Sequence, residues 1–569
     1  MSVLYSWPFM NHWTPKSVVL LKNYSARDIS ADVLAGITVG LVALPLAMAF
    51  AISSGVEPQS GLYCAIVAGF LISALGGSRF QIGGPTGAFV VVVAGIVTTH
   101  GLDGLFMCTM MAGVMLVIMG ATGMGTAVKF IPRPVVVGFT NGIAVLIAST
   151  QLKDFFGLQV AEVPSEFWPR MTTLAQHAGT LSLPATAVAA STLIGILVWN
   201  RRIPRVPGYI VALFGTTALA ATVALPIETI GSRFGGIPAG WPAFAIPKFR
   251  MDLIPALISP AITVAMLGAI ESLMSAVVAD RMGGDRHNPN VELIAQGVAN
   301  IASPLVGGLP ATGALARTAT NIRAGARSPV SGMVHALTLL AILLVAAPMA
   351  RFIPLAALSA ILLIVAYNMG DWGEVPELLK LTKTDISVWL VTFGLTVFAD
   401  LTVAVEVGMV LAMLLFIRRV SETTTVSRVT PEYVDAGRVH VLQDKEIPDY
   451  VTVFRIHGPF LFGTGDKITR LPIDHLTPIV ILRLRNMTAI DATGLRSLEE
   501  LADALHKTGR ELILCGAPKQ PAAMMAQAEF HDHVGAGNIC PNIAAAIERA
   551  AVVYAEMTPT DKPSLPTAV

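Results

Sequence analysis

The sequence predicts a polytopic α-helical membrane protein that ends in a small cytoplasmic α/β domain. Of its 569 residues, 54% are hydrophobic and 13% are charged, and the mean hydropathy is +0.68. Soluble globular proteins carry about 25% charged residues, so about half of the expected charge is missing. Apolar runs fill residues 33–417, and frequent charges return only after Arg418 and Arg419.

The same composition excludes several classes of protein. Its hydropathy excludes a water-soluble enzyme and a disordered chain. A net charge of +1, from 38 basic and 37 acidic residues, provides no basic surface for nucleic acid. The four cysteines include no CxxC pair and predict neither a disulfide framework nor a zinc site. Without a nucleophile elbow, a phosphate loop or a metal-spaced cluster, we expect no cofactor and no bound metal.

Fourteen apolar segments are candidate membrane spans, because a helix needs about 20 residues to cross about 30 Å of hydrocarbon. The third, tenth and last of them are short. In order, the spans cover residues 33–54, 60–76, 86–99, 104–121, 134–151, 181–199, 206–225, 254–279, 291–306, 313–322, 330–349, 353–369, 386–402 and 404–417.

Basic residues set the orientation of these spans, because Lys and Arg concentrate in cytoplasmic loops. Every even-numbered span is followed by such residues: Arg79; Lys129 and Arg133; Arg201, Arg202 and Arg205; Arg281 and Arg286; Arg323 and Arg327; Lys380 and Lys383; and Arg418 and Arg419. The first 30 residues lack the apolar core of a cleavable signal peptide. Both termini are therefore predicted to be cytoplasmic.

These boundaries divide the chain into five predicted parts. They are a cytoplasmic tail over 1–30, a transmembrane transport domain over 31–420, a linker over 421–437, a soluble domain over 438–555 and a disordered tail over 556–569.

Two short matches indicate an internal repeat. Residues 37–39 (Ile-Thr-Val) in span 1 recur as 262–264 in span 8, and residues 86–88 (Thr-Gly-Ala) in span 3 recur as 312–314 in span 10. Seven spans separate the copies, an odd number, so the second copy crosses the membrane in the opposite direction. The sequence thus predicts a 7+7 inverted repeat, a common plan of secondary transporters.

The repeated segments also break their helices. Residues 83–88 and 307–314 combine Gly and Pro, which interrupt regular helix. The apolar stretches that follow rise only about 21 Å and about 15 Å, so spans 3 and 10 are predicted half-helices. Their amino ends would meet near the midplane, where free N–H groups form an anion site. The alternative is that these glycines only allow close helix packing.

Glu271 lies in the middle of span 8, with Ser275 one turn further on the same face. A charge at the centre of a span costs about 2.5–3.5 kcal/mol, similar to the cost of about 4 kcal/mol for protonating a carboxyl there at neutral pH. The group is thus poised between its two states, as proton coupling requires. The alternative is a permanently protonated Glu271 that hydrogen-bonds a neighbouring helix.

Further polar residues lie within the spans. Arg317 follows the second break by one turn and could act as counter-ion to the anion or pair with Glu271. Asp400 and Glu406, near the junction of the last two spans, are expected to pack in a gate or loop. His335 is expected to be a packed polar residue.

The C-terminal region alternates strands and helices. Residues 451–456, 479–484 and 511–514 have strand patterns, and leucines at 495, 498, 501 and 505 form a helical stripe. Asp491 and Thr493 precede or begin that helix, and Thr493 could be its cap. His531 and His533 are expected in a solvated turn.

The sequence resembles the sulfate permease (SulP) family of anion transporters. The resemblance covers nearly the whole chain, and the soluble domain resembles the STAS domain of the same family. It rests on residues 45–50 (Pro-Leu-Ala-Met-Ala-Phe), 55–63, 84–86 (Gly-Pro-Thr), 271–280, 300–308 and 314–322.

The resemblance implies a substrate-carrying core (spans 1–4 and 8–11), a gate (spans 5–7 and 12–14) and elevator-like transport in a homodimer. Sodium-coupled bicarbonate members of the family carry Asp in place of Glu271. The glutamate here therefore favours the proton as the coupling ion. Asp491 and Thr493 lie where sigma-factor regulators are phosphorylated. By position, the implied anion-binding residues are Phe50, Thr86, Gly87, Ala88, Ser275, Thr312, Gly313, Ala314 and Arg317, beside the proton-coupling Glu271.

The stretch Ala-Met-Leu-Gly-Ala-Ile-Glu-Ser-Leu at 265–273 is similar to proteobacterial proton-coupled C4-dicarboxylate transporters of the family. We therefore expect proton-coupled uptake of a C4-dicarboxylate, or of sulfate, across a bacterial inner membrane. Two alternatives stay open: an electroneutral exchanger of anions such as sulfate and bicarbonate, and a membrane sensor that binds the anion and signals through the STAS domain.

Overall fold

The computed structural model describes residues 13–21, 24–126, 132–203, 207–223, 225–399, 401–429, 447–469, 471 and 477–558. The chain forms two compact units, Met1–Leu411 and Ala412–Val569. The predicted terminal tails, the linker and the first residues of the soluble domain lie partly outside the described residues. Asp400 and the side chain of Glu406 also lie outside them.

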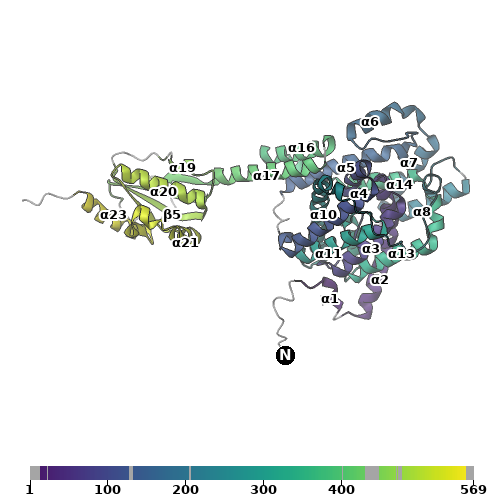
Figure 1. The fold of residues 1–569 in the computed structure, drawn as a ribbon, viewed down its shortest axis with the longest axis horizontal. Coiled ribbons are helices and arrows are strands. Elements are labelled where there is room, and N and C mark those ends of the chain that lie inside the picture. Colours follow the sequence, from purple (N-terminus) through teal and green to yellow (C-terminus); the bar gives the residue numbers. More distant parts are fainter. Residues whose placement is uncertain are drawn as a thin grey trace, which may run out of the picture. The chain divides into compact units, whose positions relative to one another are not determined.

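The first unit consists of packed helices (Figure 1). Its first half contains α2 (Ala26–Ser53), α3 (Pro58–Leu75), α4 (Gly87–Ala121), α5 (Arg133–Phe156), α7 (Leu183–Arg202) and α8 (Gly208–Val223). Its second half contains α10 (Ile254–Gly283), α11 (Pro289–Ala302), α12 (Leu315–Arg323), α13 (Val330–Ala346), α14 (Leu355–Met369), α16 (Lys383–Phe398) and the first half of α17 (Leu401–Thr423), which continues into the second unit. Short helices α1 (Lys16–Leu21), α6 (Phe167–Gln176), α9 (Ile230–Phe234) and α15 (Val375–Leu378) lie between or before them.

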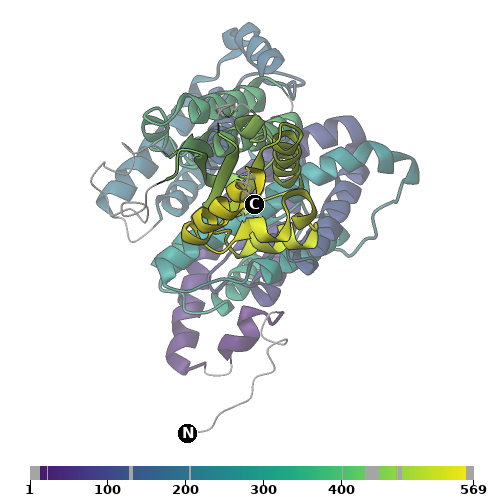
Figure 2. The ribbon, with the colours of Figure 1, turned by 90° about the vertical axis from the view of Figure 1, so that its left-hand side faces the viewer.

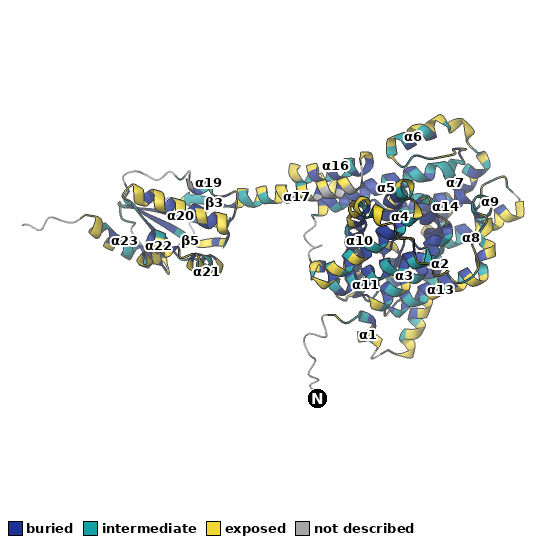
Figure 3. Ribbon diagram, viewed as in Figure 1, coloured by how far each residue is buried: buried dark blue, intermediate teal, exposed yellow. Residues whose placement is uncertain are grey.

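Each of the fourteen predicted ranges overlaps a helix. The third and fourth ranges share α4, which bends at Gly101 with a left-handed φ of 69°, a conformation that glycine adopts readily. Seven of the described helices are long and apolar enough to cross a membrane by length and composition. Figure 3 shows buried residues gathered inside this unit and exposed ones toward its outside. Exposed apolar side chains such as Phe214 on α8 and Val345 on α13 suit a hydrocarbon surrounding.

The helix contacts follow the pattern expected of an inverted repeat. Helix α4 packs against α10 and α11, and α13 packs against α2 and α3 at the corresponding place of the other half. Helix α16 packs against α5, just as α7 packs against α14. Exchanging the two halves therefore maps one set of contacts onto the other.

A buried carboxylate, Glu292, fixes the segment that leads into the first break. Its Oε2 accepts hydrogen bonds from the backbone N–H groups of Gly77 and Ser78, at 2.9 and 3.0 Å. Its Oε1 accepts from the side-chain amides of Gln81 and Gln296, at 2.9 and 3.0 Å. Four donors compensate the loss of water around this carboxylate, which ties α11 to the loop after α3.

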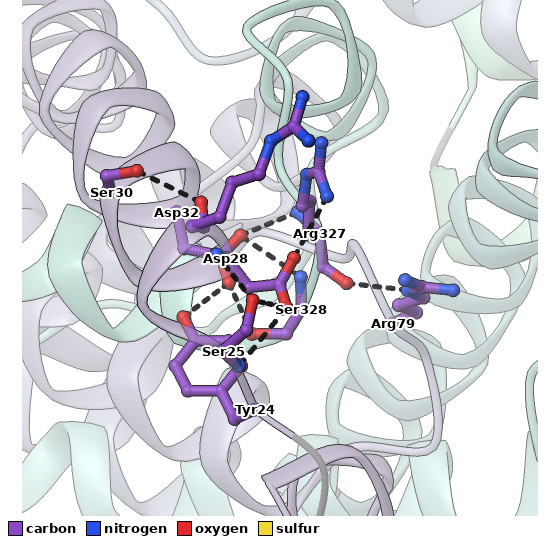
Figure 4. A network of polar contacts seen from close by, with 9 residues as sticks. Tyr24, Ser25, Asp28, Ser30, Asp32, Arg79, Arg327 and Ser328 are labelled. Atoms are coloured by element: carbon purple, nitrogen blue, oxygen red, sulfur yellow. Dashed lines mark hydrogen bonds and ion pairs between the residues drawn. The ribbon is translucent and has the colours of Figure 1, made fainter.

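A second carboxylate, Asp32, ties the start of α2 to the loop between α12 and α13 (Figure 4). Its Oδ1 accepts from the N–H groups of Arg327 and Ser328 at 2.6 and 3.1 Å, and Tyr24 donates its hydroxyl to Oδ2 at 2.6 Å. Nearby, the Arg327 guanidinium pairs with Asp28 at 3.0 Å. The two halves of the repeat are thus joined at this end of the unit.

The second unit contains a five-stranded sheet in the order β3-β4-β5-β6-β7. The strands are β3 (Thr425–Arg428), β4 (Val451–Phe460), β5 (Ile479–Ile490), β6 (Glu511–Cys515) and β7 (Ile539–Cys540), and only the β3–β4 pairing is antiparallel. Helix α20 (Ala492–Lys507) covers one face of the sheet and α23 (Ile543–Met557) covers the other (Figure 2). The predicted leucine stripe of α20 is buried, which confirms the α/β prediction, whereas β3 and β7 were not predicted.

Candidate functional site

The two predicted helix breaks meet in the middle of the first unit. Strand β1 (Gly83–Gly84) pairs antiparallel with β2 (Thr312–Gly313), so that Gly83 faces Gly313 and Gly84 faces Thr312. Helix α4 follows β1, and α12 follows β2 after Ala314. The amino ends of the two helices therefore start from one short ribbon.

Hydrogen bonds from neighbouring elements decide where α12 begins. The N–H of Gly313 donates to Ser272 Oγ at 3.0 Å, and the N–H of Ala314 donates to the carbonyl of Ile82 at 2.8 Å. Both amides are therefore engaged, and the helix starts at Leu315, two residues later than the sequence predicts. The first free amides of α12 are consequently those of Leu315 and Ala316.

Both helix starts leave amides without a capping side chain. Within the described residues, no side chain accepts a hydrogen bond at the N-cap of α4, which is Thr86, or of α12, which is Ala314. The first amides of a helix have no intrahelical partner, and they carry the positive end of the helix dipole. The pair of starts is thus a backbone site suited to an anion.

The carboxyl of Glu271 lies beside the start of α4. The hydroxyl of Thr86 donates a hydrogen bond of 2.8 Å to Glu271 Oε2. Glu271 is half-buried on α10, and it lines a cavity rather than the outer surface of the unit. The carboxyl therefore has a polar partner and access to a ligand.

Arg317 is buried and points at the ribbon. Its Nη2 donates to the carbonyl of Pro85, and its Nη1 is buried with no hydrogen-bond partner among the residues that the structure describes. No ion pair joins Arg317 to Glu271, although both are among the described residues. Gly84 makes room for this side chain, since a Cβ there would lie 2.7 Å from Nη1. The arrangement favours the counter-ion role over a fixed internal salt bridge.

A cavity of about 190 Å³ adjoins these groups. Seven predicted residues line it: Phe50, Thr86, Gly87, Glu271, Gly313, Ala314 and Arg317. Three others do not: Ala88 packs in the apolar core, Ser275 donates to Thr318 Oγ1 at 3.2 Å, and Thr312 exchanges a hydrogen bond of 2.7 Å with Ser272. These three residues support the site from behind.

The cavity also has lining residues that the sequence analysis missed. On its exposed rim, Leu315 and Ala316 come from α12, Asn368 comes from the end of α14, and Asp371 comes from the segment that follows it. Partial loss of contact with water raises the pKa of Asp371 above its usual range, and the charge of Arg133 opposes this shift. Tyr209 of α8 completes the wall. No motif singles out these residues, because they reach the cavity only through tertiary packing.

Apolar side chains form another part of the cavity lining. Val42, Leu46 and Phe50 project from α2, and Val365 and Met369 project from α14. With the repeat offset of 225, Leu46 corresponds to Glu271 in the other half. Both halves of the repeat thus supply polar and apolar residues to one cavity.

In the second unit, Asp491 rather than Thr493 caps α20. Asp491 Oδ1 accepts from the N–H of Gly494 at 2.8 Å, and Oδ2 accepts from the N–H of Phe462 at 2.9 Å. Thr493 is exposed in the first turn, so the expectation that it caps the helix is wrong. His531 and His533 belong to the one-turn helix α22 (His531–Val534), and His533 Nδ1 lies 3.0 Å from Asp503 Oδ1.

Sequence profiles of known families cover both units. The profile of the sulfate permease family matches residues 29–392, and that of the STAS domain matches residues 443–546. The chain belongs to the sulfate permease family. It is therefore a multi-pass membrane protein and an anion transporter with a C-terminal STAS domain.

Named relatives of this sulfate permease family chain support the assignment. "Putative sulfate transporter YvdB" of Bacillus subtilis is 42% identical over 520 residues, which cover 90% of this chain and 96% of the relative. "Bicarbonate transporter BicA" of Picosynechococcus sp. is 32% identical over 458 residues, covering 78% of this chain and 81% of the relative.

A solved structure shares the fold over both units. The murine Slc26a9 anion transporter in the inward-facing state superposes with a TM-score of 0.85 and covers 97% of this chain and 96% of its own, at 18% identity. At that identity the likeness concerns the fold alone.

Proposed function

We propose that this chain is a proton-coupled symporter of C4-dicarboxylates, with sulfate as the second candidate substrate. The observation that carries the proposal is one cavity that brings together an uncapped helix start, the Arg317 guanidinium and the Glu271 carboxyl. Among the described residues, Nη1 of this guanidinium has no partner. An anion, its counter-charge and a proton acceptor would then share one site.

The two walls of the cavity favour an organic anion. Free amides and Arg317 would bind one carboxylate, since hydrogen bonds to charged groups are the strong ones. The apolar wall of Val42, Leu46 and Phe50 would contact a carbon backbone, which gains free energy when it leaves water. Sulfate has no apolar part, so this wall would leave some of its oxygens without partners.

Proton coupling is assigned to Glu271. An ionised Glu271 would repel a substrate carboxylate in the same cavity, whereas the protonated form could donate a hydrogen bond to it. Binding of the anion and of the proton would therefore favour each other, as symport requires.

Transport itself would follow an elevator-like movement. The core comprises α2, α3, α4 and α10–α13, and the gate comprises α5, α7, α8, α14, α16 and α17. Core residues supply the amides, Glu271 and Arg317, whereas gate residues supply Tyr209 and Asn368. The core could thus carry the anion past a fixed wall.

The proposed topology has fourteen spans and two cytoplasmic termini, in a homodimer of a bacterial inner membrane. The exposed rim of the cavity includes the start of α12 and the end of α14. Arg323 ends α12, and Lys380 lies in the segment that follows α14. By the positive-inside rule this side is cytoplasmic, so the cavity would be open inward.

Anion exchange is the second candidate function, because the relatives are named after sulfate and bicarbonate. Uptake into proteoliposomes with an inward proton gradient separates the two. We expect the gradient to drive accumulation of labelled succinate. Excess unlabelled succinate should suppress this accumulation more strongly than excess sulfate or bicarbonate does. Uptake that needs an internal exchangeable anion and does not respond to the proton gradient would contradict symport, and absence of flux with retained anion binding would indicate a sensor.

A further inference from the structure

An apolar groove opens on the outer surface of the first unit, away from the anion cavity. It has a volume of about 420 Å³ and lies between α8, α2, α3, α13 and the segment Ala347–Phe352. Met48, Phe214, Ala221, Met349 and Phe352 are among its lining residues. Surrounding side chains such as Val345 and Met349 are exposed and apolar, so the groove would face the hydrocarbon of the membrane.

One polar atom inside this groove has no partner. The hydroxyl of Thr217 is buried and lacks a hydrogen-bond partner among the described residues. Its neighbours on α8 differ, since Thr216 donates to the carbonyl of Ala212 at 2.7 Å and Thr222 donates to that of Ala218 at 2.9 Å. A buried hydroxyl without a partner is costly, so a ligand with an oxygen acceptor at this depth is favoured.

A cation lies at the end of the groove. The Arg351 guanidinium lies over the ring of Phe352, 4.6 Å from its centroid, and Phe352 lines the groove. Arg351 is exposed and forms no ion pair within the described part of the chain. It follows span 11, which ends on the outer side in the predicted topology. Arginine at the end of a span lies at the headgroup level of the bilayer.

We propose that this groove binds one phospholipid of the outer leaflet. Its acyl chain would fill the apolar groove, an ester oxygen would accept from Thr217, and its phosphate would bind Arg351. A second copy of the chain is less favoured, because an apolar interface would leave both Arg351 and the Thr217 hydroxyl without partners.

The site has a consequence that rests on the proposed core-and-gate movement. Helices α2, α3 and α13 belong to the proposed core, and α8 belongs to the gate, so the lipid would lie on the seam between them. Its retention in the groove would favour one position of the core over the other. Lipid binding itself does not depend on transport, and the two can fail separately.

The test uses the full chain in phosphatidylcholine vesicles that contain phosphatidylglycerol with a photoreactive diazirine on its acyl chain. We expect labelled peptides from α8 and from residues 330–352. Ala221→Trp, which fills the groove, should remove this labelling, and Arg351→Gln should lower it about tenfold, the worth of a charge-assisted hydrogen bond. Arg351→Lys should restore part of it.

Val345→Trp is the matched control, because Val345 is exposed on α13 and does not line the groove. Its labelling should equal that of the unaltered chain. If Ala221→Trp does not fold, Thr217→Val and Arg351→Gln still decide. Labelling that is spread evenly over all outward faces of the helices would overturn the proposal. Labelling that neither Thr217→Val nor Arg351→Gln lowers would overturn it as well. Disulfide cross-linking of two copies through Phe214→Cys would overturn it too, because a second copy would then cover the groove.

Discussion

The Thr86 hydroxyl and the Glu271 carboxylate are joined by a hydrogen bond of 2.8 Å. Thr86 is the N-cap of α4, in the first half of the repeat, and Glu271 lies in the middle of α10, in the second half. This contact places the proposed proton acceptor beside the free amides of a helix start. Substrate binding and protonation could therefore influence each other over one contact.

Removal of the Thr86 hydroxyl should weaken transport. In Thr86→Val the contact with Glu271 is lost, and a hydrogen bond of about 1 kcal/mol corresponds to about a fivefold loss of initial uptake rate. Thr86→Ser should keep most of the activity. Thr98→Val is the matched control, because Thr98 on the same helix only donates to its own helix carbonyl of Ala94. Equal loss in Thr86→Val and Thr98→Val would speak against a specific role.

Arg317 should set the affinity for the anion. Arg317→Gln removes the guanidinium whose Nη1 has no partner in the described part of the chain, and the KM for substrate should rise about tenfold or more. Arg317→Lys should recover only part of this affinity. The planar guanidinium can donate to the Pro85 carbonyl and to a ligand at the same time, whereas the lysine ammonium lacks this forked geometry. Arg323→Gln, on the exposed end of α12, should leave the KM unchanged. An unaltered KM in Arg317→Gln would exclude the counter-ion role.

Glu292 should matter for stability and not for substrate affinity. In Glu292→Gln, an amide N–H₂ group would face donors from Gly77, Ser78, Gln81 or Gln296. Disrupting a buried, hydrogen-bonded charge costs about 3–5 kcal/mol, so the thermal unfolding midpoint should fall by several degrees. Exposed Glu166→Gln is the control. A normal midpoint in Glu292→Gln would show that this network adds little.

Asp491 should stabilise the STAS domain through two backbone hydrogen bonds. Asp491→Ala removes the cap of α20 and should destabilise the second unit by about 1–2 kcal/mol, measured by denaturant unfolding of the full chain. Thr493→Val should have little effect, because the exposed Thr493 side chain does not cap the helix. A larger loss of stability in Thr493→Val than in Asp491→Ala would show that Thr493, and not Asp491, caps α20.

Local sequence signals predicted the helices and breaks well. Gly and Pro in residues 83–88 and 307–314 marked the two starts, and Gly101 lies in the gap between the third and fourth predicted spans. The strand patterns and the leucine stripe of the C-terminal domain were equally readable. All of these depend on residues that are close in the chain.

Features set by distant residues could not be read in this way. The start of α12 depends on Ser272 and Ile82, which engage the amides of Gly313 and Ala314. Likewise, Asp371, which follows α14, reaches the cavity only because α14 packs beside α2. The carboxylates Asp32 and Glu292 adjoin loops in sequence, where an exposed position is the usual outcome, and their burial follows from partners far along the chain.

The most direct test of the central claim compares Glu271→Gln with the unaltered chain in proteoliposomes that carry an inward proton gradient. The account predicts that gradient-driven accumulation of succinate is abolished, while succinate binding is partly retained because the amides and Arg317 remain. Accumulation equal to that of the unaltered chain would contradict the assignment of Glu271 as the proton-coupling group.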